Sequence, residues 1–251
     1  MPSKHLTNVV QNLEKRKFRG KYNLFKIEGE KLVGELLRSG LKIDTLIALP
    51  EWLDGRDDVP AGCTVEEVNR REMERITTFK SAPAVIALAE MPPEATPEVP
   101  ADGLSVALNG VQDPGNLGTI LRVCDWFGVH RVFCDRECAG YLNPKVIQAS
   151  MGAIFRVGVA YVDLLDFIPA TVTGEFPCYG TFLEGESLYT VKRGDRGLIL
   201  MGNEGGGIAP ALARLVTRGL TIPRFSPAAD SLNVGVAAGI VLSEFRRTTD
   251  N

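Results

Sequence analysis

From residue 104 onward, short apolar runs alternate with longer segments whose apolar positions recur every three or four residues. The short runs predict β-strands and the periodic segments predict helices. The expected strands cover 104–108, 131–134, 156–160, 178–182, 198–201 and 220–222, and the expected helices cover 117–127, 144–150, 164–170, 210–217 and 234–246. This alternation favours an α/β fold with a parallel sheet covered on both faces, whose ligands bind beyond the carboxyl ends of the strands.

Up to residue 90 the pattern is shorter and less regular. A stripe of Val9, Val10 and Leu13 predicts a helix over 7–17, and apolar residues from Leu32 onward predict a second helix that starts at Gly29 and is closed by Gly40. Strands are expected at 24–27, 43–49, 63–68 and 84–89, with a helix at 70–76. Together these elements indicate a small α/β sandwich.

Four prolines fall within the fifteen residues from Ala89 to Gly103. Such a segment forms neither a helix nor a central strand and is typical of a stiff linker. We therefore expect a first domain at 1–90, a linker at 91–103 and a second domain at 104–251.

The composition is that of a globular protein, with 45% hydrophobic and 24% charged residues in a chain of 251. The longest apolar run, Val234–Leu242, has nine residues and contains two glycines, too short for a membrane span. The first residues offer no apolar core for a signal peptide, because Glu14 is followed directly by Lys15, Arg16 and Lys17. We expect a cytoplasmic protein that does not bind membranes.

Cysteine and histidine usage narrows the chemistry. Five cysteines are an odd number, which favours a reduced compartment over a disulfide framework. Cys134 and Cys138 have only His130 near them, so we expect no metal site. The other histidine is His5, and two histidines exclude catalysis that depends on several of them.

Charge is unevenly distributed. Residues 1–42 hold ten Lys and Arg against four Glu, a net charge of +6, so the remainder carries −9. A basic end on an acidic body suggests that this end binds an anion such as RNA. The candidate RNA-binding residues are Lys15, Arg16, Lys17 and Arg19. A solvated helix face explains the same charges equally simply.

Three unusual loops follow expected strands of the second domain. In the first, Asp113, Pro114 and Gly115 turn the chain, Asn116 is placed to cap a helix, and Arg122 follows within two turns. The second, 201–208, contains three successive glycines, which permit close backbone approach to a ligand, but it lacks the G-x-G-x-x-G dinucleotide pattern. The third, 222–234, ends in Ser231 and Asn233 at a helix start. Taken singly, each loop is explained by architecture alone.

Taken together, the loops resemble a known family. The sequences QDPGNLGTILR at 112–122, GNEG at 202–205 and SLNV at 231–234 resemble the three motifs of the SpoU (TrmH-like) RNA 2′-O-methyltransferases of the SPOUT superfamily. The segment 21–33 looks like the substrate-binding domain that often precedes such enzymes, a domain similar to the L30e fold. The resemblance implies a deep trefoil knot in the C-terminal part, a homodimer, and S-adenosylmethionine (SAM) as cofactor.

The resemblance also implies roles for individual residues. The expected catalytic residues are Asn116, Arg122, Glu204, Ser231 and Asn233. The expected SAM contacts, made largely by backbone, are Thr181, Gly202, Ile222 and Leu232. Arg122 is either an activator of the ribose hydroxyl or a clamp for an RNA phosphate, and we favour the clamp because guanidinium keeps its proton.

Other interpretations stay open at this point. A nucleotide-dependent oxidoreductase lacks its glycine fingerprint here, and a non-catalytic RNA-binding protein would not need all the polar motif residues that this chain retains. Ribosomal RNA is the favoured substrate because of the first domain, and transfer RNA is the alternative. The sequence does not specify which nucleotide is modified.

Overall fold

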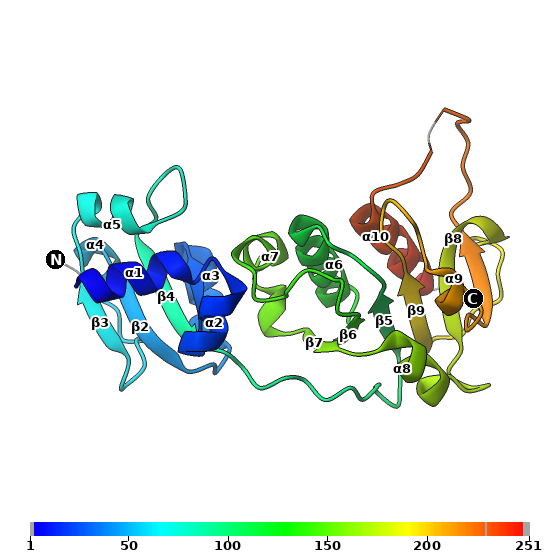
Figure 1. Ribbon diagram of the computed structural model, residues 1–251, viewed down its shortest axis with the longest axis horizontal. Coiled ribbons are helices and arrows are strands. Elements are labelled where there is room, and N and C mark those ends of the chain that lie inside the picture. Colours follow the sequence, from blue (N-terminus) through cyan, green and yellow to red (C-terminus); the bar gives the residue numbers. More distant parts are fainter. Residues whose placement is uncertain (1–2, 229, 248–251) are drawn as a thin grey trace. The chain divides into compact units, whose positions relative to one another are not determined.

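The computed structural model describes residues 3–228 and 230–247, which form two compact units (Figure 1). The first unit comprises the chain up to Pro93 together with Leu142–Gln148, and the second comprises Glu94–Tyr141 and the chain from Ala149 onward. Among the described residues, no helix combines the length and the apolar character that a membrane crossing requires.

The first unit is built on a four-stranded sheet in the order β1-β4-β2-β3, in which only β2 and β3 run parallel. Helices α1 and α5 cover one face, where Val10, Leu13 and Met73 meet Ile47 and Ile86 in a single apolar cluster. The elements are α1 (Lys4–Asn12), α2 (Arg16–Tyr22), β1 (Leu24–Glu28), α3 (Glu30–Arg38), β2 (Ile43–Ala48), α4 (Pro50–Leu53), β3 (Thr64–Glu67), α5 (Arg70–Ile76) and β4 (Val85–Glu90).

The single helix expected over 7–17 is wrong: the chain forms α1 and α2 with a break between them. Lys15 adopts an extended conformation, and the buried guanidinium of Arg19 donates hydrogen bonds of 2.9 Å to the carbonyls of Leu13 and Glu14. Arg19 therefore satisfies backbone groups that the broken helix would leave unpaired. An apolar stripe carries no signal for this contact.

A cluster of buried charged side chains surrounds Lys26 on β1. Lys26 is 1% exposed, and its ammonium contacts Glu14 at 2.7 Å and Glu28 at 2.5 Å. Glu28 also accepts hydrogen bonds from the hydroxyl groups of Thr77 and Thr78, which follow α5. The cluster thus joins β1 to the α5–β4 loop.

The second unit contains a six-stranded sheet in which every pair of neighbours is parallel, as expected. The order is β10-β8-β9-β5-β6-β7, so that β5, the first strand of the unit, lies in the middle. The strands are β5 (Leu104–Leu108), β6 (Arg131–Cys134), β7 (Gly158–Tyr161), β8 (Cys178–Ser187), β9 (Gly197–Met201) and β10 (Arg218–Thr221).

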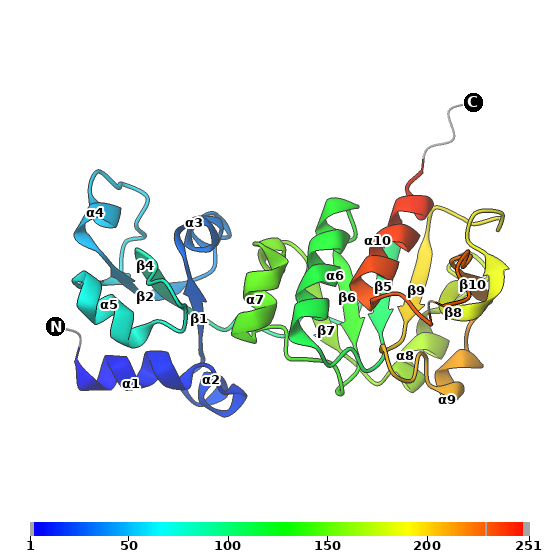
Figure 2. The same ribbon diagram turned by 90° about the horizontal axis from the view of Figure 1, so that it is seen from above.

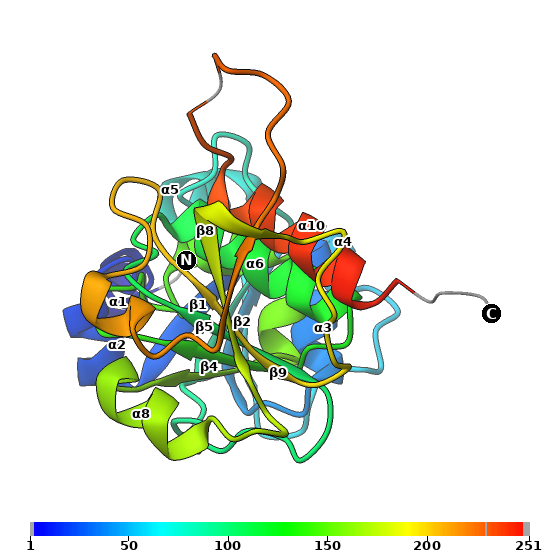
Figure 3. The ribbon, with the colours of Figure 1, turned by 90° about the vertical axis from the view of Figure 1, so that its right-hand side faces the viewer.

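Helices cover both faces of this sheet (Figures 2 and 3). Helices α6 (Pro114–Trp126) and α10 (Val234–Phe245) pack against each other on one face. Helices α8 (Leu164–Thr171) and α9 (Pro210–Ala213) bury Ile168 and Leu212 on the other. Along the chain, α7 (Pro144–Ser150) and the 3₁₀ turn η1 (Ala153–Phe155) come between β6 and β7. The helix expected over 210–217 ends at Ala213, because the chain turns there to bring Thr217 onto the carbonyl of Cys178.

The cysteines are free and mostly buried. Burial raises the pKa of the Cys178 thiol to about 12 and raises the pKa of Cys124 further. A hydrogen bond with Cys138 and burial together raise the pKa of Cys134. These thiols therefore stay protonated near neutral pH, and only Cys63 is partly accessible.

The Lys26 cluster gives a first prediction. Lys26→Met keeps the volume of the side chain but leaves two carboxylates without their cation, so we expect a loss of about 3–5 kcal/mol in the free energy of unfolding. Lys42→Met is the matched control, since Lys42 is an exposed partner of Glu90 at 2.5 Å and solvent-exposed pairs contribute little to stability. Urea denaturation followed by circular dichroism measures both. Equal losses in the two variants would show that the buried cluster is dispensable.

Candidate functional site

Three loops meet at the carboxyl edge of the second sheet. They follow β5, β9 and β10, and β5 and β9 are direct neighbours with Leu108 paired to Met201. Because parallel strands end at the same edge, loops far apart in sequence converge there. This is where the sequence predicts the site.

The first loop is capped differently from the prediction. Asp113, not Asn116, is the N-cap of α6, and its carboxylate accepts a 2.8 Å hydrogen bond from the Asn116 backbone N–H. Asn116 lies inside the first turn of the helix. Its side-chain amide therefore does not cap the helix and can form hydrogen bonds with other loops.

That amide joins all three loops in one chain of hydrogen bonds. The Asn116 Nδ2 group donates to the carboxylate of Glu204 in the glycine loop, and Asn116 Oδ1 accepts a 2.8 Å hydrogen bond from Asn233 Nδ2. Asn233 is the N-cap of α10, with its Oδ1 accepting from the N–H groups of Gly235 at 2.9 Å and Val236 at 3.2 Å. Both amide orientations are thereby set, and the three side chains form a polar ridge in which Glu204 and Asn233 are exposed and Asn116 is half-buried.

The glycine loop is a tight closed turn. Asn203 and Gly207 form a two-way backbone bridge, and Asn203 Oδ1 accepts from the N–H groups of Gly205 at 3.0 Å and Gly206 at 2.6 Å. A Cβ atom at Gly202 would overlap the backbone of Gly207, whereas one at Gly207 would meet nothing within 4 Å. The loop is thus closed on one side and presents bare backbone on the other.

Asn109 and Asp135 hold the glycine loop in place, and the sequence analysis did not identify either. Asn109 Nδ2 donates to Asp135 at 2.6 Å, and Asn109 Oδ1 accepts a 2.8 Å hydrogen bond from the N–H of Ala209, just after the glycine loop. Asp135 also accepts from the N–H of Gly110 at 2.9 Å. One amide therefore ties together the segments that follow β5, β6 and β9. In the sequence, the only signal for Asn109 is its position directly after a buried strand.

The residues expected to contact a cofactor all lie at this edge. Gly202 follows β9, Ile222 follows β10, and Leu232, 48% exposed, precedes the α10 cap. Thr181 lies just past the last β8–β9 pair, and its hydroxyl is 3.4 Å from the carbonyl oxygen of Leu200. The sequence predicts that the strand starting at residue 178 ends at residue 182. Strand β8 instead continues to Ser187, with a large bulge opposite β10.

Arg122 does not join the ridge. It is exposed and has no hydrogen bond or ion pair with any residue in 3–228 or 230–247. At 100° per residue, Arg122 is rotated by roughly 240° around α6 from Asn116. It shares a face with Trp126, which is 83% exposed. Ser231 is also exposed and makes no hydrogen bond with the described residues.

The basic candidates of the first unit divide into two groups. Lys15, Arg16 and Lys17 are exposed, and Lys17 lies 5.8 Å from the centre of the Phe18 ring. Arg19 is 5% exposed and its guanidinium bonds to backbone carbonyls, so it differs from the other three in what it offers to solvent. Within the described part of the chain, no group of three or more His, Cys, Asp or Glu is arranged to hold a metal ion.

Comparisons with known proteins agree with the motif resemblance. Residues 103–243 match the family model described as SpoU rRNA Methylase family, and residues 8–87 match the MRM3-like substrate binding domain. A 23S rRNA guanosine 2′-O-methyltransferase of Bacillus subtilis is 29% identical over 94% of each chain. The chain is also similar to a 23S rRNA guanosine 2′-O-methyltransferase of Neisseria meningitidis, 36% identical over 57% of this chain and 58% of the other.

Solved structures extend the likeness to the whole chain. A protein of the TrmH family of RNA methyltransferases from Porphyromonas gingivalis superposes with a TM-score of 0.90 at 36% identity, over 98% of each chain. An AdoMet-bound rRNA methyltransferase from Sinorhizobium meliloti superposes with a TM-score of 0.87 at 30% identity, over 98% of this chain and 96% of the other.

The glycine loop gives a second prediction. Gly202→Ala forces Cβ into the Gly207 backbone, and we expect it to lower the free energy of unfolding by about 1–3 kcal/mol. Gly205→Ala is the control, since its Cβ would lie 3.8 Å from Asn203 Oδ1, an ordinary contact, and we expect about 0.5 kcal/mol or less. Thermal unfolding of both variants decides; a Gly202→Ala protein as stable as the control contradicts the closed-loop geometry.

Proposed function

The chain belongs to the SpoU rRNA methylase family, and we infer that it methylates the ribose 2′-hydroxyl of a nucleotide in ribosomal RNA with SAM as methyl donor. The observation that carries this inference is the hydrogen-bonded ridge of Glu204, Asn116 and Asn233, in which the three family motifs meet. An oxidoreductase does not need this ridge, and a protein that only binds RNA needs no glycine loop beside it.

The carboxyl edge fits SAM. Gly202 follows β9, Ile222 follows β10, and Leu232 precedes α10. All three lie outside the strands, where backbone groups are free of a sheet partner. The open side of Gly207 leaves room for a flat ring beside bare backbone. We propose that these residues and Thr181 hold SAM mainly through main-chain groups. When bound, SAM supplies an activated methyl group on a sulfonium.

The chain's own residues then position the acceptor. Asn116, held by Glu204 on one side and Asn233 on the other, presents a fixed polar surface to a ribose, with Ser231 beside Asn233 in the sequence. Alignment of the reacting atoms can supply roughly 7–11 kcal/mol of the barrier. Glu204 acts as a brace, because its carboxylate is occupied by the Asn116 amide.

Arg122 lies outside the ridge, on another face of α6 from Asn116, so we propose that it serves the site of a second copy. A guanidinium stays protonated and binds a phosphate with two parallel N–H groups. Arg122 would therefore clamp the RNA phosphate next to the target ribose in the partner's site and favour loss of the hydroxyl proton.

The exposed face of α6 and α10 supports a homodimer. Trp126 on α6 is 83% exposed and Val236 on α10 is 51% exposed, and large apolar side chains left in solvent are candidates for burial against a partner. Gly235 packs within the copy, since its Cβ would lie 2.9 Å from Thr119. Gly239, one turn later, faces open space and leaves room for another helix.

We also propose the finer architecture that the family implies: an RNA-docking domain with an L30e-like fold at 1–90, a linker at 91–103, and a methyltransferase domain at 104–251 with a C-terminal trefoil knot. The match of residues 8–87 to a substrate-binding domain supports the first assignment. Five free cysteines and a ribosomal substrate support a cytoplasmic location.

The central test is methylation of unmodified total RNA with labelled SAM, followed by separation of ribosomal from transfer RNA. We expect label in ribosomal RNA, and label in transfer RNA alone would overturn the assignment of ribosomal RNA as the substrate.

Arg122→Ala and Arg122→Lys should both abolish labelling, because neither retains a planar bidentate donor. Their affinity for SAM, measured by calorimetry with a chelator present, should stay within a few-fold of wild type. No binding of SAM or its demethylated product at millimolar concentration would refute the function.

A mixing control tests whether Arg122 acts across copies. Arg122→Ala and Asn116→Ala proteins, each inactive, are unfolded together and refolded. If Arg122 serves the partner's site, heterodimers contain one intact site, and a random mixture recovers about a quarter of wild-type activity. If Arg122 acts within its own copy, no site is intact and no activity returns.

A further prediction concerns the exposed basic residues. Changing Lys15, Arg16 and Lys17 together to Gln should weaken RNA binding more at low salt than at high salt. The salt slope should flatten by about 0.7 log units per tenfold salt for each RNA phosphate that these side chains no longer neutralise. Filter binding at several salt concentrations measures this, with Lys42→Gln as a control for an exposed lysine. An unchanged slope would mean that these charges only solvate the first helices.

A further inference from the structure

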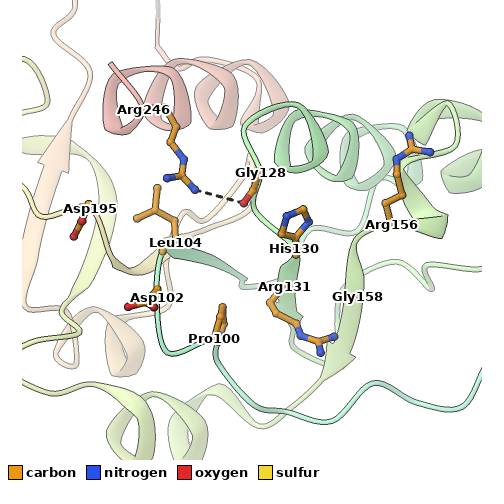
Figure 4. Close-up of a pocket in the computed structure, with 11 residues that line it drawn as sticks. Pro100, Asp102, Leu104, Gly128, His130, Arg131, Arg156, Gly158, Asp195 and Arg246 are labelled. Carbon is orange, nitrogen blue, oxygen red and sulfur yellow. Dashed lines mark hydrogen bonds between the residues drawn. The ribbon is translucent and has the colours of Figure 1, made fainter. Parts of the chain in front are cut away.

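A pocket of about 650 Å³ opens at the amino-terminal edge of the six-stranded sheet, opposite the edge that holds the ridge (Figure 4). Leu104, Arg131 and Gly158 line it from the starts of β5, β6 and β7, and Gly128 and Arg246 line it from the ends of α6 and α10. It lies wholly within the second unit and shares no residue with the ridge. Its volume is in the range of small-molecule sites.

Two of its three arginines already have structural roles. Arg156 forms a 2.8 Å ion pair with Asp125. Arg246 donates at 2.9 Å to the carbonyl of Phe127, which satisfies the end of α6. Neither needs a ligand to explain its position.

Arg131 is different. Its side chain is half-buried, yet it has no acceptor and no ion-pair partner among the described residues. The guanidinium lies across Gly158, where any Cβ atom would overlap it. A guanidinium carries five N–H donors, and withdrawing them from water without an acceptor is unfavourable. Arg131 therefore lies at the pocket wall with planar N–H donors that have no acceptor among the described residues.

Acceptors line the other side of the pocket. Asp102 and Asp195 are exposed, form no ion pair with the described arginines, and lie away from Arg131 in Figure 4. A ligand that suits both sides carries an anion at one end and N–H donors at the other. A phosphate fits the Arg131 fork, and the amino edge of a base fits carboxylates.

We propose that this pocket binds a nucleotide, with its phosphate on Arg131 and its base towards Asp102 and Asp195. The nucleotide is either a free nucleoside monophosphate or a nucleotide of the bound RNA. The second source rests on the proposed function; the first does not.

The free-nucleotide arm uses calorimetry with GMP, UMP and guanosine, in the presence of saturating S-adenosylhomocysteine so that the catalytic edge is filled. GMP should bind more tightly than guanosine, which lacks the phosphate, and than UMP, which lacks an amino group. Arg131→Ala removes the cation, and Gly158→Ala displaces it while keeping its charge. Arg196→Ala is the matched control, since Arg196 lies at the same edge outside the pocket and pairs with Glu175 at 2.8 Å.

The RNA arm uses filter binding of a single-stranded oligoribonucleotide at several salt concentrations. If the nucleotide belongs to RNA, Arg131→Ala should lower affinity at low salt and flatten the slope by about 0.7 log units per tenfold salt. Gly158→Ala should lower affinity as well, and Arg196→Ala should change neither affinity nor slope.

The proposal holds if Arg131→Ala and Gly158→Ala, but not Arg196→Ala, lower affinity at least fivefold in one of the two arms, and the arm affected identifies the source. It is overturned if both variants match Arg196→Ala in both arms. SAM affinity and methylation by the wild-type protein are recorded in parallel, so that failure of the methyltransferase function is seen separately from failure of this pocket.

Discussion

The side-chain amide of Asn116 is the contact on which the site depends. It bonds to Glu204, 88 residues later, and to Asn233, 117 residues later. Each of these loops is supported locally: Asp113 caps α6, Asn203 closes the glycine turn, and Asn233 caps α10. The Asn116 amide, which donates on one side and accepts on the other, bonds directly to both of the other loops. The parallel sheet makes this contact feasible, because it delivers all three loops to one edge.

Local signals predicted most of the fold. Helix α5 spans the expected residues and begins at a reciprocal cap formed by Asn69 and Glu72, and β5 and β6 are short apolar runs between turn residues. The errors lie where a distant residue decides the local structure. The break between α1 and α2 depends on the Arg19 guanidinium, and the end of α9 depends on Cys178. The motif residues were likewise identified in sequence, but Asn109 and Asp135 act through partners that no local pattern reveals.

Formal charge in the first unit overstates what a ligand can reach. Lys26 and Arg19 contribute to the basic excess of residues 1–42, yet both are buried and neutralised or hydrogen-bonded within the fold. The charge available for an anion comes from exposed residues such as Lys15, Arg16 and Lys17. The same distinction applies in the second unit, where Arg156 and Arg246 have partners and Arg131 has none among residues 3–228 and 230–247. Counting charges along a sequence therefore locates a candidate surface without identifying which side chains form it.

The position of β5 in the sheet has a consequence for how the protein is made. β5 begins at Leu104, but its pairing with β9 starts only at Gly197, and the helix that supplies Asn233 is the last in the described chain. Contacts so distant in sequence form slowly, and chains fold from the N-terminus as they are synthesised. The first unit, apart from Leu142–Gln148, is complete in sequence well before the Asn116 ridge has all its members. On a translating ribosome the first unit is therefore synthesised before the residues that complete the ridge, and the ridge forms only after Asn233 and α10 have been made.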